Sequence, residues 1–223
     1  GSTTVKAVVL HPETSEILHR RYLRHNARQT ETVHDVLQDI FRLFPGETYR
    51  TAVCGSGGRT IASLIHAFYI QEVVANSIAV KTFHPRTRVA VELGGQDAKI
   101  VFFHYDQATR RLVASDMRMN GSCAGGTGAF IDEVASLLKI PVEEFEAAAA
   151  RGTHVYDISG RCGVFAKTDI QPLLNQGVSR EDIALSSFHA IAKQTIGGLA
   201  QGLELRPPIV FEGGPLTFNP TLI

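Results

Sequence analysis

Two of the three cysteines lie in glycine-rich segments, where a thiol has room to meet a bulky ligand. Cys123 belongs to the segment NGSCAGGTGAFI over residues 120–131, and Cys162 to the segment GRCG over residues 160–163. Each precedes a predicted helix, whose free N–H groups and dipole favour a thiolate. A twofold axis would supply two such cysteines from each subunit, enough to hold one iron–sulfur cluster or one zinc ion. The alternative is a pair of half-buried free thiols, and the residues alone leave both open.

The remaining potential metal ligands do not form a pattern. Cys54 follows the strand-like run TAV, and we interpret it as a structural thiol that serves packing. His34, His66 and His189 fall within predicted helices, and the sequence has no HExxH pair. Three cysteines do not make a disulfide framework, and the odd count indicates a reducing, cytoplasmic compartment.

Three glycine turns that adjoin predicted strands are candidates for a phosphate site. The segment GSTT over residues 1–4 offers consecutive N–H groups and three hydroxyls to an anion, and Lys6 follows two residues later. In the turn GGQD over residues 94–97, Asp97 is able to organise a hydrated Mg²⁺ and Gln96 to position an attacking water. The turn GGP over residues 213–215 offers exposed backbone on which an adenine can lie.

The phosphate-binding motifs of the common nucleotide folds are missing. The sequence contains no GxxxxGK[ST] and no GxGxxG after a strand, which disfavours a P-loop or a Rossmann site. A single GG turn between strands is commonly only a hairpin turn. Three such turns beside predicted strands favour a phosphate-binding cleft of another kind.

Alternating strand and helix patterns must position these residues. Apolar periodicity predicts strands over residues 5–10, 17–23, 49–54, 89–93, 99–104 and 209–211, and helices over 30–44, 60–68, 127–139, 141–151, 170–176 and 179–205. Ser179 and Asp182 have the spacing of a capping box. We expect two α/β subdomains around one cleft, covering residues 1–87 and 88–223. The abrupt first and last segments lead us to expect a piece of a longer protein, with the first strand and a C-terminal helix cut short.

Composition narrows the class of protein. The chain has 223 residues, of which 44% are apolar, and its 22 basic and 22 acidic side chains give zero net charge. Zero charge removes the usual electrostatic argument for nucleic acid or an anionic membrane as partner. No apolar run reaches the ~20 residues that span a bilayer. We expect a globular, cytoplasmic protein.

Taken together, the motifs resemble those of the BadF/BadG/BcrA/BcrD-type ATPases, which include activators of 2-hydroxyacyl-CoA dehydratases and ATPase subunits of benzoyl-CoA reductases. The segments GSTTVK, GGQDAK, the residue 120–131 cysteine loop, CGVFAK and GGP occur in the family's order and cover essentially the whole chain. The two cysteine motifs are the most specific part, because related sugar kinases and actin-like ATPases lack them.

The resemblance implies an acetate kinase/Hsp70/actin-like fold, in which two ribonuclease-H-like subdomains enclose a nucleotide. It implies ATP or ADP with Mg²⁺ and one [4Fe–4S] cluster per homodimer, or per pseudo-dimer of tandem domains. The implied function is ATPase activity coupled to delivery of a low-potential electron. The implied partners are an iron–sulfur dehydratase or reductase and an upstream donor such as ferredoxin or flavodoxin.

The site residues implied by the resemblance fall into three groups. The cluster ligands are Cys123 and Cys162, and the catalytic pair is Gln96 and Asp97. The nucleotide-binding residues are Gly1, Ser2, Thr3, Thr4, Lys6, Gly94, Gly95, Gln96, Thr127, Gly213, Gly214 and Pro215.

The sequence departs from the family pattern at several points. An Asp usually precedes the first Gly-Ser-Thr, and here the chain begins at that glycine. Glu92 stands in place of the commoner Asp before the second turn. Lys167 stands where many small activators carry an acid, and the lysine form is similar to large proteins with two such domains in tandem.

Two other functions remain open. One is a nucleotide-binding regulatory module of the Hsp70/actin type without redox chemistry, which would bind no iron. The other is a small-molecule kinase of the same fold, for which Asp97 or Asp169 would be the catalytic Asp that faces a substrate hydroxyl.

Overall fold

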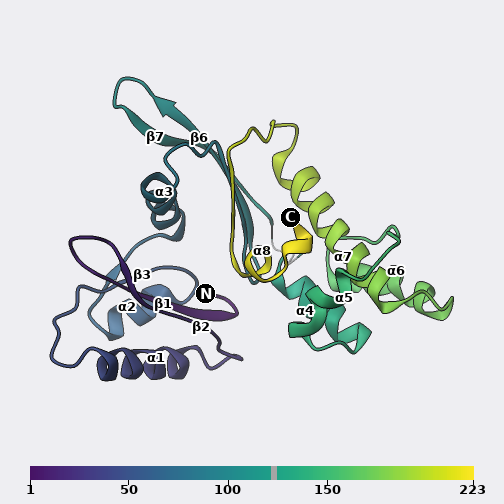
Figure 1. Cartoon of the computed structure of the whole chain (residues 1–223), viewed down its shortest axis with the longest axis horizontal. Helices are drawn as coiled ribbons and strands as arrows, with labels where there is room; N and C mark the ends of the chain where they lie inside the picture. Colours follow the sequence, from purple (N-terminus) through teal and green to yellow (C-terminus); the bar gives the residue numbers. More distant parts are fainter. Residues whose placement is uncertain (122–124) are drawn as a thin grey trace. The chain divides into compact units, whose positions relative to one another are not determined.

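The computed structural model describes residues 1–121 and 125–223, and internal contacts divide the chain into two compact units (Figure 1). Gly1–Ile78 form unit 1 and Ala79–Ile223 form unit 2, so the division falls inside helix α3 (Glu72–Phe83). The ribonuclease-H-like ranges 1–87 and 88–223 stay a prediction.

Unit 1 begins with a two-stranded antiparallel ribbon and one covering helix. Strand β1 (Thr4–Leu10) pairs with β2 (Ile17–Arg24), and α1 (Gln29–Leu43) packs on one face of the ribbon. Side chains alternate along a strand, so Val5 turns inward to form a small core with Val36 and Ile40 of the helix. All three elements lie close to the predicted ranges.

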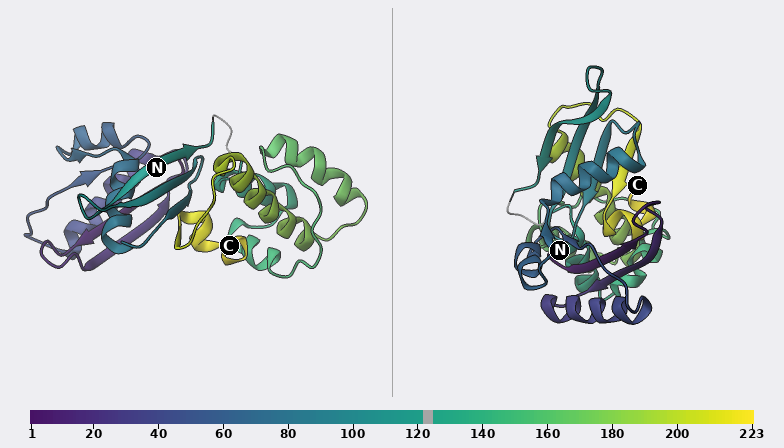
Figure 2. Two further views of the ribbon diagram at one scale, coloured as in Figure 1. Left: turned by 90° about the horizontal axis from the view of Figure 1, so that it is seen from above. Right: turned by 90° about the vertical axis from the view of Figure 1, so that its left-hand side faces the viewer.

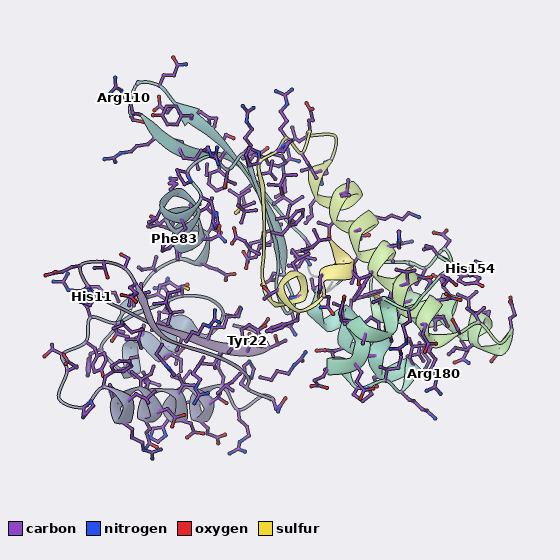
Figure 3. The ribbon with its side chains drawn as sticks, in the orientation of Figure 1. His11, Tyr22, Phe83, Arg110, His154 and Arg180 are labelled. Atoms are coloured by element: carbon purple, nitrogen blue, oxygen red, sulfur yellow. The ribbon has the colours of Figure 1, made fainter. Side chains whose placement is uncertain are left out.

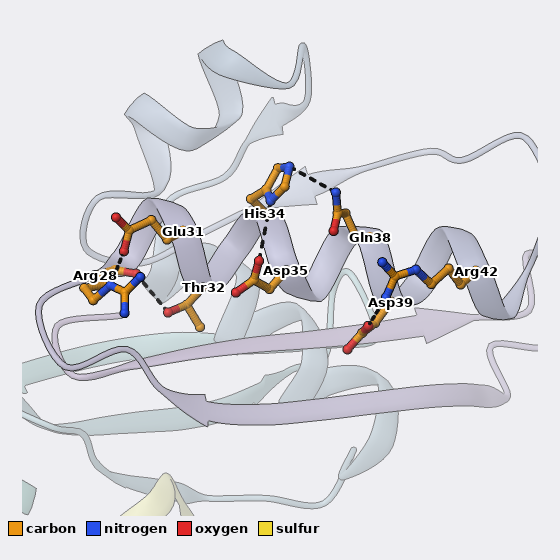
Figure 4. Close-up of polar contacts among 8 residues, drawn as sticks. All are labelled: Arg28, Glu31, Thr32, His34, Asp35, Gln38, Asp39 and Arg42. Atoms are coloured by element: carbon orange, nitrogen blue, oxygen red, sulfur yellow. Dashed lines mark hydrogen bonds and ion pairs between the residues drawn. The ribbon is translucent and has the colours of Figure 1, made fainter.

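The outer face of α1 is polar, and its side chains pair along the helix (Figure 4). Arg28 contacts Glu31, and Arg42 donates to Asp39 over 3.4 Å. Pairs at this spacing each add only about 0.2–0.5 kcal/mol to a helix. The apolar stripe on the inner face therefore decides where the helix packs.

The rest of unit 1 is short and irregular. Strand β3 (Ala52–Val53) pairs in parallel with β4 (Phe68–Tyr69), and α2 (Gly58–Leu64) connects them. The predicted helix over 60–68 is therefore too long at its end, and the predicted strand over 49–54 is cut to two residues. Cys54 falls in the turn after β3 and is exposed, so the interpretation of it as a packing thiol is wrong. His66 has a left-handed φ of 54° beyond α2, so its placement in a helix is also wrong.

Unit 2 is built on a four-stranded sheet in the order β7-β6-β5-β8. Strands β5 (Val89–Leu93), β6 (Ala98–Asp106) and β7 (Arg111–Met119) are antiparallel neighbours, and β8 (Ile209–Glu212) runs parallel to β5. The β6–β7 hairpin projects beyond the other strands, with Arg110 at its tip (Figure 3). Strand β7 lies outside the strand predictions, because its polar side chains hide the alternation.

Helices cover one face of this sheet and build the main core (Figure 2). Phe130 of α4 (Gly128–Leu138), Phe145 of α5 (Phe145–Ala149), Ile170 of α6 (Gly163–Asn175) and Phe188 of α7 (Arg180–Thr195) are fully buried there. Short 3₁₀ turns span Val142–Glu144 and Pro220–Leu222, and α8 (Gly214–Phe218) follows β8. The opposite face packs on the second half of α3 through Val80.

The helix boundaries confirm one cap prediction and correct two lengths. The N–H of Asp182 donates to the Ser179 hydroxyl over 3.1 Å, as the capping box predicts. Helix α6 begins at Gly163 instead of residue 170. The α-helix expected to reach residue 205 ends at Thr195 and continues as a π-helical turn over Ile196–Ala200, which contains two glycines. Among the described helices, none is both long enough and apolar enough to cross a membrane.

Candidate functional site

The turn between β5 and β6 is the first part of the candidate site, and helix α4 holds it from behind. The Gly94 N–H donates to the Asp97 carbonyl over 2.7 Å, which closes the turn tightly. The first N–H groups of α4 then donate to this turn, Gly128 to the Gly94 carbonyl over 2.9 Å and Ala129 to the Gly95 carbonyl over 2.8 Å. The first N–H groups of a helix have no hydrogen-bond partner within the helix, and here two of them bind and hold the turn.

The segment after β8 lies against the same turn. Gly213 has φ +93°, and a Cβ there would come within 2.0 Å of the Leu93 carbonyl oxygen, so only glycine fits. A Cβ on Gly128 would meet the Pro215 ring at 3.3 Å. Because β5 and β8 are parallel, their carboxyl ends lie side by side, which is where open α/β sheets bind ligands.

Unit 2 therefore brings together most of the residues predicted to bind nucleotide. Gln96 is exposed, whereas the Thr127 side chain is completely buried at the start of α4. The predicted nucleotide-binding residues in this unit are Gly94, Gly95, Gln96, Thr127, Gly213, Gly214 and Pro215, and the predicted catalytic Asp97 lies in the same turn. Their contact with a nucleotide stays a prediction.

Charged residues on three neighbouring strands form a row next to these loops: Glu212 on β8, Glu92 on β5 and Lys99 on β6. The ammonium group of Lys99 lies 3.5 Å from the Glu92 carboxylate, and the two side chains are only 6% and 21% exposed. Glu92 is also the strand partner of Glu212 on β8. The row places the carboxylates of Glu92 and Glu212 beside the glycine turns, and the buried Lys99 ammonium balances part of their negative charge.

In unit 1, side chains of residues 25–29, where β2 leads into α1, contact the first glycine segment, residues 1–4. The Gly1 carbonyl accepts a hydrogen bond from the Gln29 amide over 2.9 Å and lies 3.1 Å from the His25 Nε2. The same amide donates to the Ser56 carbonyl over 3.0 Å, so Gln29 joins the 1–4 segment to the glycine turn at 55–58. The Lys6 ammonium lies 5.4 Å from the centre of the Tyr22 ring.

The described part of the cysteine motifs shows the two segments in direct contact. A Cβ on Gly125 would lie 1.7 Å from the Arg161 carbonyl oxygen, so the two segments cross at a point where no side chain fits. Gly163 likewise packs on Glu133 of α4. Cys162 is partly exposed at the N-cap of α6. Cys123 lies outside the described residues.

Three residues that help to build the site were not among the predicted site residues. Asn120, Gln29 and Lys99 act through contacts with backbone or with a strand partner. The sequence contains a signal for two of them. Asn120 is the first residue of the cysteine segment, and Lys99 lies opposite Glu92 in the register of the two strands. For residues 1–121 and 125–223, no three His, Cys, Asp or Glu side chains converge as a metal site.

Comparisons with known proteins agree with this geometry. The sequence profile of the BadF/BadG/BcrA/BcrD ATPase family matches residues 1–221. Over 145 residues the chain is 28% identical to the (R)-2-hydroxyglutaryl-CoA dehydratase activating ATPase of Acidaminococcus fermentans and 30% identical to the 2-hydroxyisocaproyl-CoA dehydratase activator of Clostridioides difficile. These matches cover 65% of this chain and 53% and 52% of the relatives, so the chain spans about half the length of the curated relatives it matches.

Solved structures of such activators match nearly the whole chain. The activator of the 2-hydroxyisocaproyl-CoA dehydratase from Clostridium difficile, solved with bound ADPNP, superposes with a TM-score of 0.82 at 25% identity. The match covers 99% of this chain and 80% of the activator chain. The predicted α/β architecture, the actin/Hsp70-like ATPase fold, is confirmed.

Proposed function

Because the chain belongs to the BadF/BadG/BcrA/BcrD ATPase family, we propose that it is an ATP-dependent activator or reductase component that supplies a low-potential electron to a partner iron–sulfur enzyme. The partner would be of the 2-hydroxyacyl-CoA dehydratase class, as it is for the named relatives. The odd number of cysteines favours a reducing compartment, so the proposed location is the cytoplasm.

The observation that carries the proposal is the convergence of three glycine segments at the carboxyl ends of β5 and β8. The 94–97 turn, the start of α4 and the 213–215 segment pack closely on one another through backbone carbonyls, glycine Cα atoms and the Pro215 ring. Such close backbone packing suits a ligand that is bound by main-chain groups, as phosphates are. A relative with this fold was solved with ADPNP bound.

Each segment has a proposed task in nucleotide binding. The 94–97 turn would receive the phosphates, with Gln96 orienting the attacking water and Asp97 holding hydrated Mg²⁺. The 213–215 segment would support the adenosine, and Thr127 would brace it from behind. The 1–4 segment and Lys6 of unit 1 would supply the other phosphate contacts.

The residues around Cys162 fit one side of a shared cluster site. Its thiol is partly exposed at a helix N-cap, where the free N–H groups of the helix favour a thiolate. We assign Cys162 and Cys123 as ligands, with the same pair from a second subunit or a tandem domain completing the set. When bound, a [4Fe–4S] cluster supplies a one-electron redox centre.

ATP would act on this centre through linkage. A nucleotide changes the electron-donating state only if it binds two conformations of the protein with different affinity. One electron would enter from reduced ferredoxin or flavodoxin and leave to the iron–sulfur centre of the partner. Hydrolysis of ATP to ADP and phosphate would reset the conformations.

The test is anaerobic reconstitution of the full-length protein with iron and sulfide. Wild type should bind one [4Fe–4S] cluster per two chains, with visible absorption and ATP-dependent reduction of an acceptor. Cys162→Ser should lose the iron, whereas the control Cys54→Ser should retain it, because Cys54 lies in the other unit.

Other outcomes would overturn the proposal. Unchanged iron content in Cys162→Ser would refute the ligand assignment. A colourless wild-type protein that binds nucleotide would indicate the non-redox regulatory ATPase. Phosphoryl transfer to a small-molecule hydroxyl would indicate the kinase.

A further inference from the structure

The stretch between β7 and α4, which carries Cys123 in its sequence, is hydrogen-bonded at both of its ends to the 94–98 turn. At the near end, the Asn120 N–H donates to the Ala98 carbonyl over 3.0 Å. At the far end, the N–H groups of Gly128 and Ala129 donate to the carbonyls of the turn over 2.9 and 2.8 Å. The proposed phosphate turn and the proposed cluster segment are therefore physically one assembly.

Asn120 contributes the side-chain part of this connection. Its Oδ1 accepts a hydrogen bond from the Ala98 N–H over 2.8 Å, and its Nδ2 donates to the Gln96 carbonyl over 3.4 Å. The amide group thus spans the last two peptides of the turn, beside the exposed Gln96 side chain. The bonds at the α4 end involve only backbone groups, so no side-chain substitution removes them.

The far end of the same stretch also contacts the second cysteine segment. Gly125 packs on the carbonyls of Gly160 and Arg161, where a Cβ would lie at 2.6 and 1.7 Å. Cys162 is the next residue after Arg161. Backbone contacts at α4 and at Gly125 therefore connect the turn to the neighbourhood of Cys162.

We propose that Asn120 is a positioning residue that couples the nucleotide state of the 94–97 turn to the cysteine segments. This inference rests on the proposed function, because it takes that turn to contact the nucleotide phosphates. When the turn moves, the Asn120 amide moves the near end of the cysteine segment, while the amides of α4 move the far end.

Replacement of Asn120 tests this coupling separately from stability. Asn120→Ala removes both side-chain bonds, whereas Asn120→Asp keeps the acceptor for the Ala98 N–H and loses the donor to the Gln96 carbonyl. The matched control is Asn175→Ala, at the last residue of α6, whose side chain contacts only Gln171 among the described hydrogen bonds.

The measurement is the iodoacetamide alkylation rate of Cys123 and Cys162, resolved by mass spectrometry in the apo full chain with and without ADP or ADPNP. Binding of a fluorescent ADP is titrated in parallel. In wild type the nucleotide should change the alkylation rates about 5-fold or more, the lower end of typical coupling. In Asn120→Ala this ratio should fall towards 1 while nucleotide affinity changes less than about 3-fold, with Asn120→Asp intermediate and Asn175→Ala like wild type.

A purely structural role would alter the rates with and without nucleotide equally and leave their ratio unchanged. That result, or a wild-type ratio of 1 despite nucleotide binding, would overturn the inference and leave the proposed function standing. Failure of wild type to bind nucleotide would refute the proposed function, and the inference with it.

Discussion

The buried ion pair beneath the glycine turns gives the sharpest prediction about stability. The ammonium of Lys99 and the Glu92 carboxylate are 3.5 Å apart, with side chains 6% and 21% exposed. At an effective dielectric constant near 20 their attraction is about 5 kcal/mol at that 3.5 Å separation, before the cost of desolvation is subtracted. Removing only Lys99 keeps that desolvation cost for Glu92 and removes the attraction.

We therefore expect Lys99→Met to lower the free energy of unfolding by about 3 kcal/mol, the range found when one partner of a buried pair is removed. The double variant Lys99→Met/Glu92→Gln should recover at least half of the loss, because the pair's uncompensated carboxylate is gone. The matched control is Lys193→Met, which breaks a pair of 3.0 Å to Asp157 whose side chains are 73% and 92% exposed. This surface pair should cost less than about 1 kcal/mol.

The assay is urea unfolding at pH 7 followed by circular dichroism, with hydrogen exchange at the amides of β5 and β6 to locate the loss. Raising NaCl from 0.1 to 1 M should weaken the Lys193 pair and leave the Lys99 pair largely unchanged, because salt screens exposed charges most. If Lys99→Met costs no more than Lys193→Met, or if the double variant is no more stable than Lys99→Met, the buried-pair argument is wrong.

Two further predictions concern backbone crossing and pH. Gly125→Ala should destabilise unit 2 by about 1–3 kcal/mol, since its Cβ would overlap the Arg161 carbonyl, whereas Gly197→Ala, with nothing within 4 Å, should be nearly neutral in the same thermal scan. The pKa of Asp182 is lowered from 3.8, first by hydrogen bonds from two backbone N–H groups of the 153–154 loop, so its stabilising effect is present above that value and lost as pH falls through the lowered pKa. Asp182→Asn should therefore lower Tm at pH 7, and the difference from wild type should shrink as pH falls through the lowered pKa; a difference that does not change with pH would contradict this.

Local patterns predicted much of the secondary structure and failed where packing sets the boundary. The strand at 89–93 is wholly apolar apart from Glu92, and the capping box at Ser179 is a contact between residues three apart, so both are visible in sequence. Helix α3 escaped prediction because apolar side chains occur all round it, and β7 because its polar side chains interrupt the alternation. Cys54 was placed wrongly because a two-residue strand leaves it in a turn.

The sequence by itself determined the chemistry available: three glycine turns, two cysteines in glycine-rich segments, and the family motifs that connect them. Only the tertiary structure decided which of these meet. The close packing of Gly213 on Leu93, of α4 on the 94–97 turn and of Gly125 on Arg161 joins residues 30 to 120 positions apart, roughly counted along the chain. Such contacts depend on backbone carbonyls and missing side chains, which leave no periodic signal, and Asn120 acquires its place only when β7 pairs with β6.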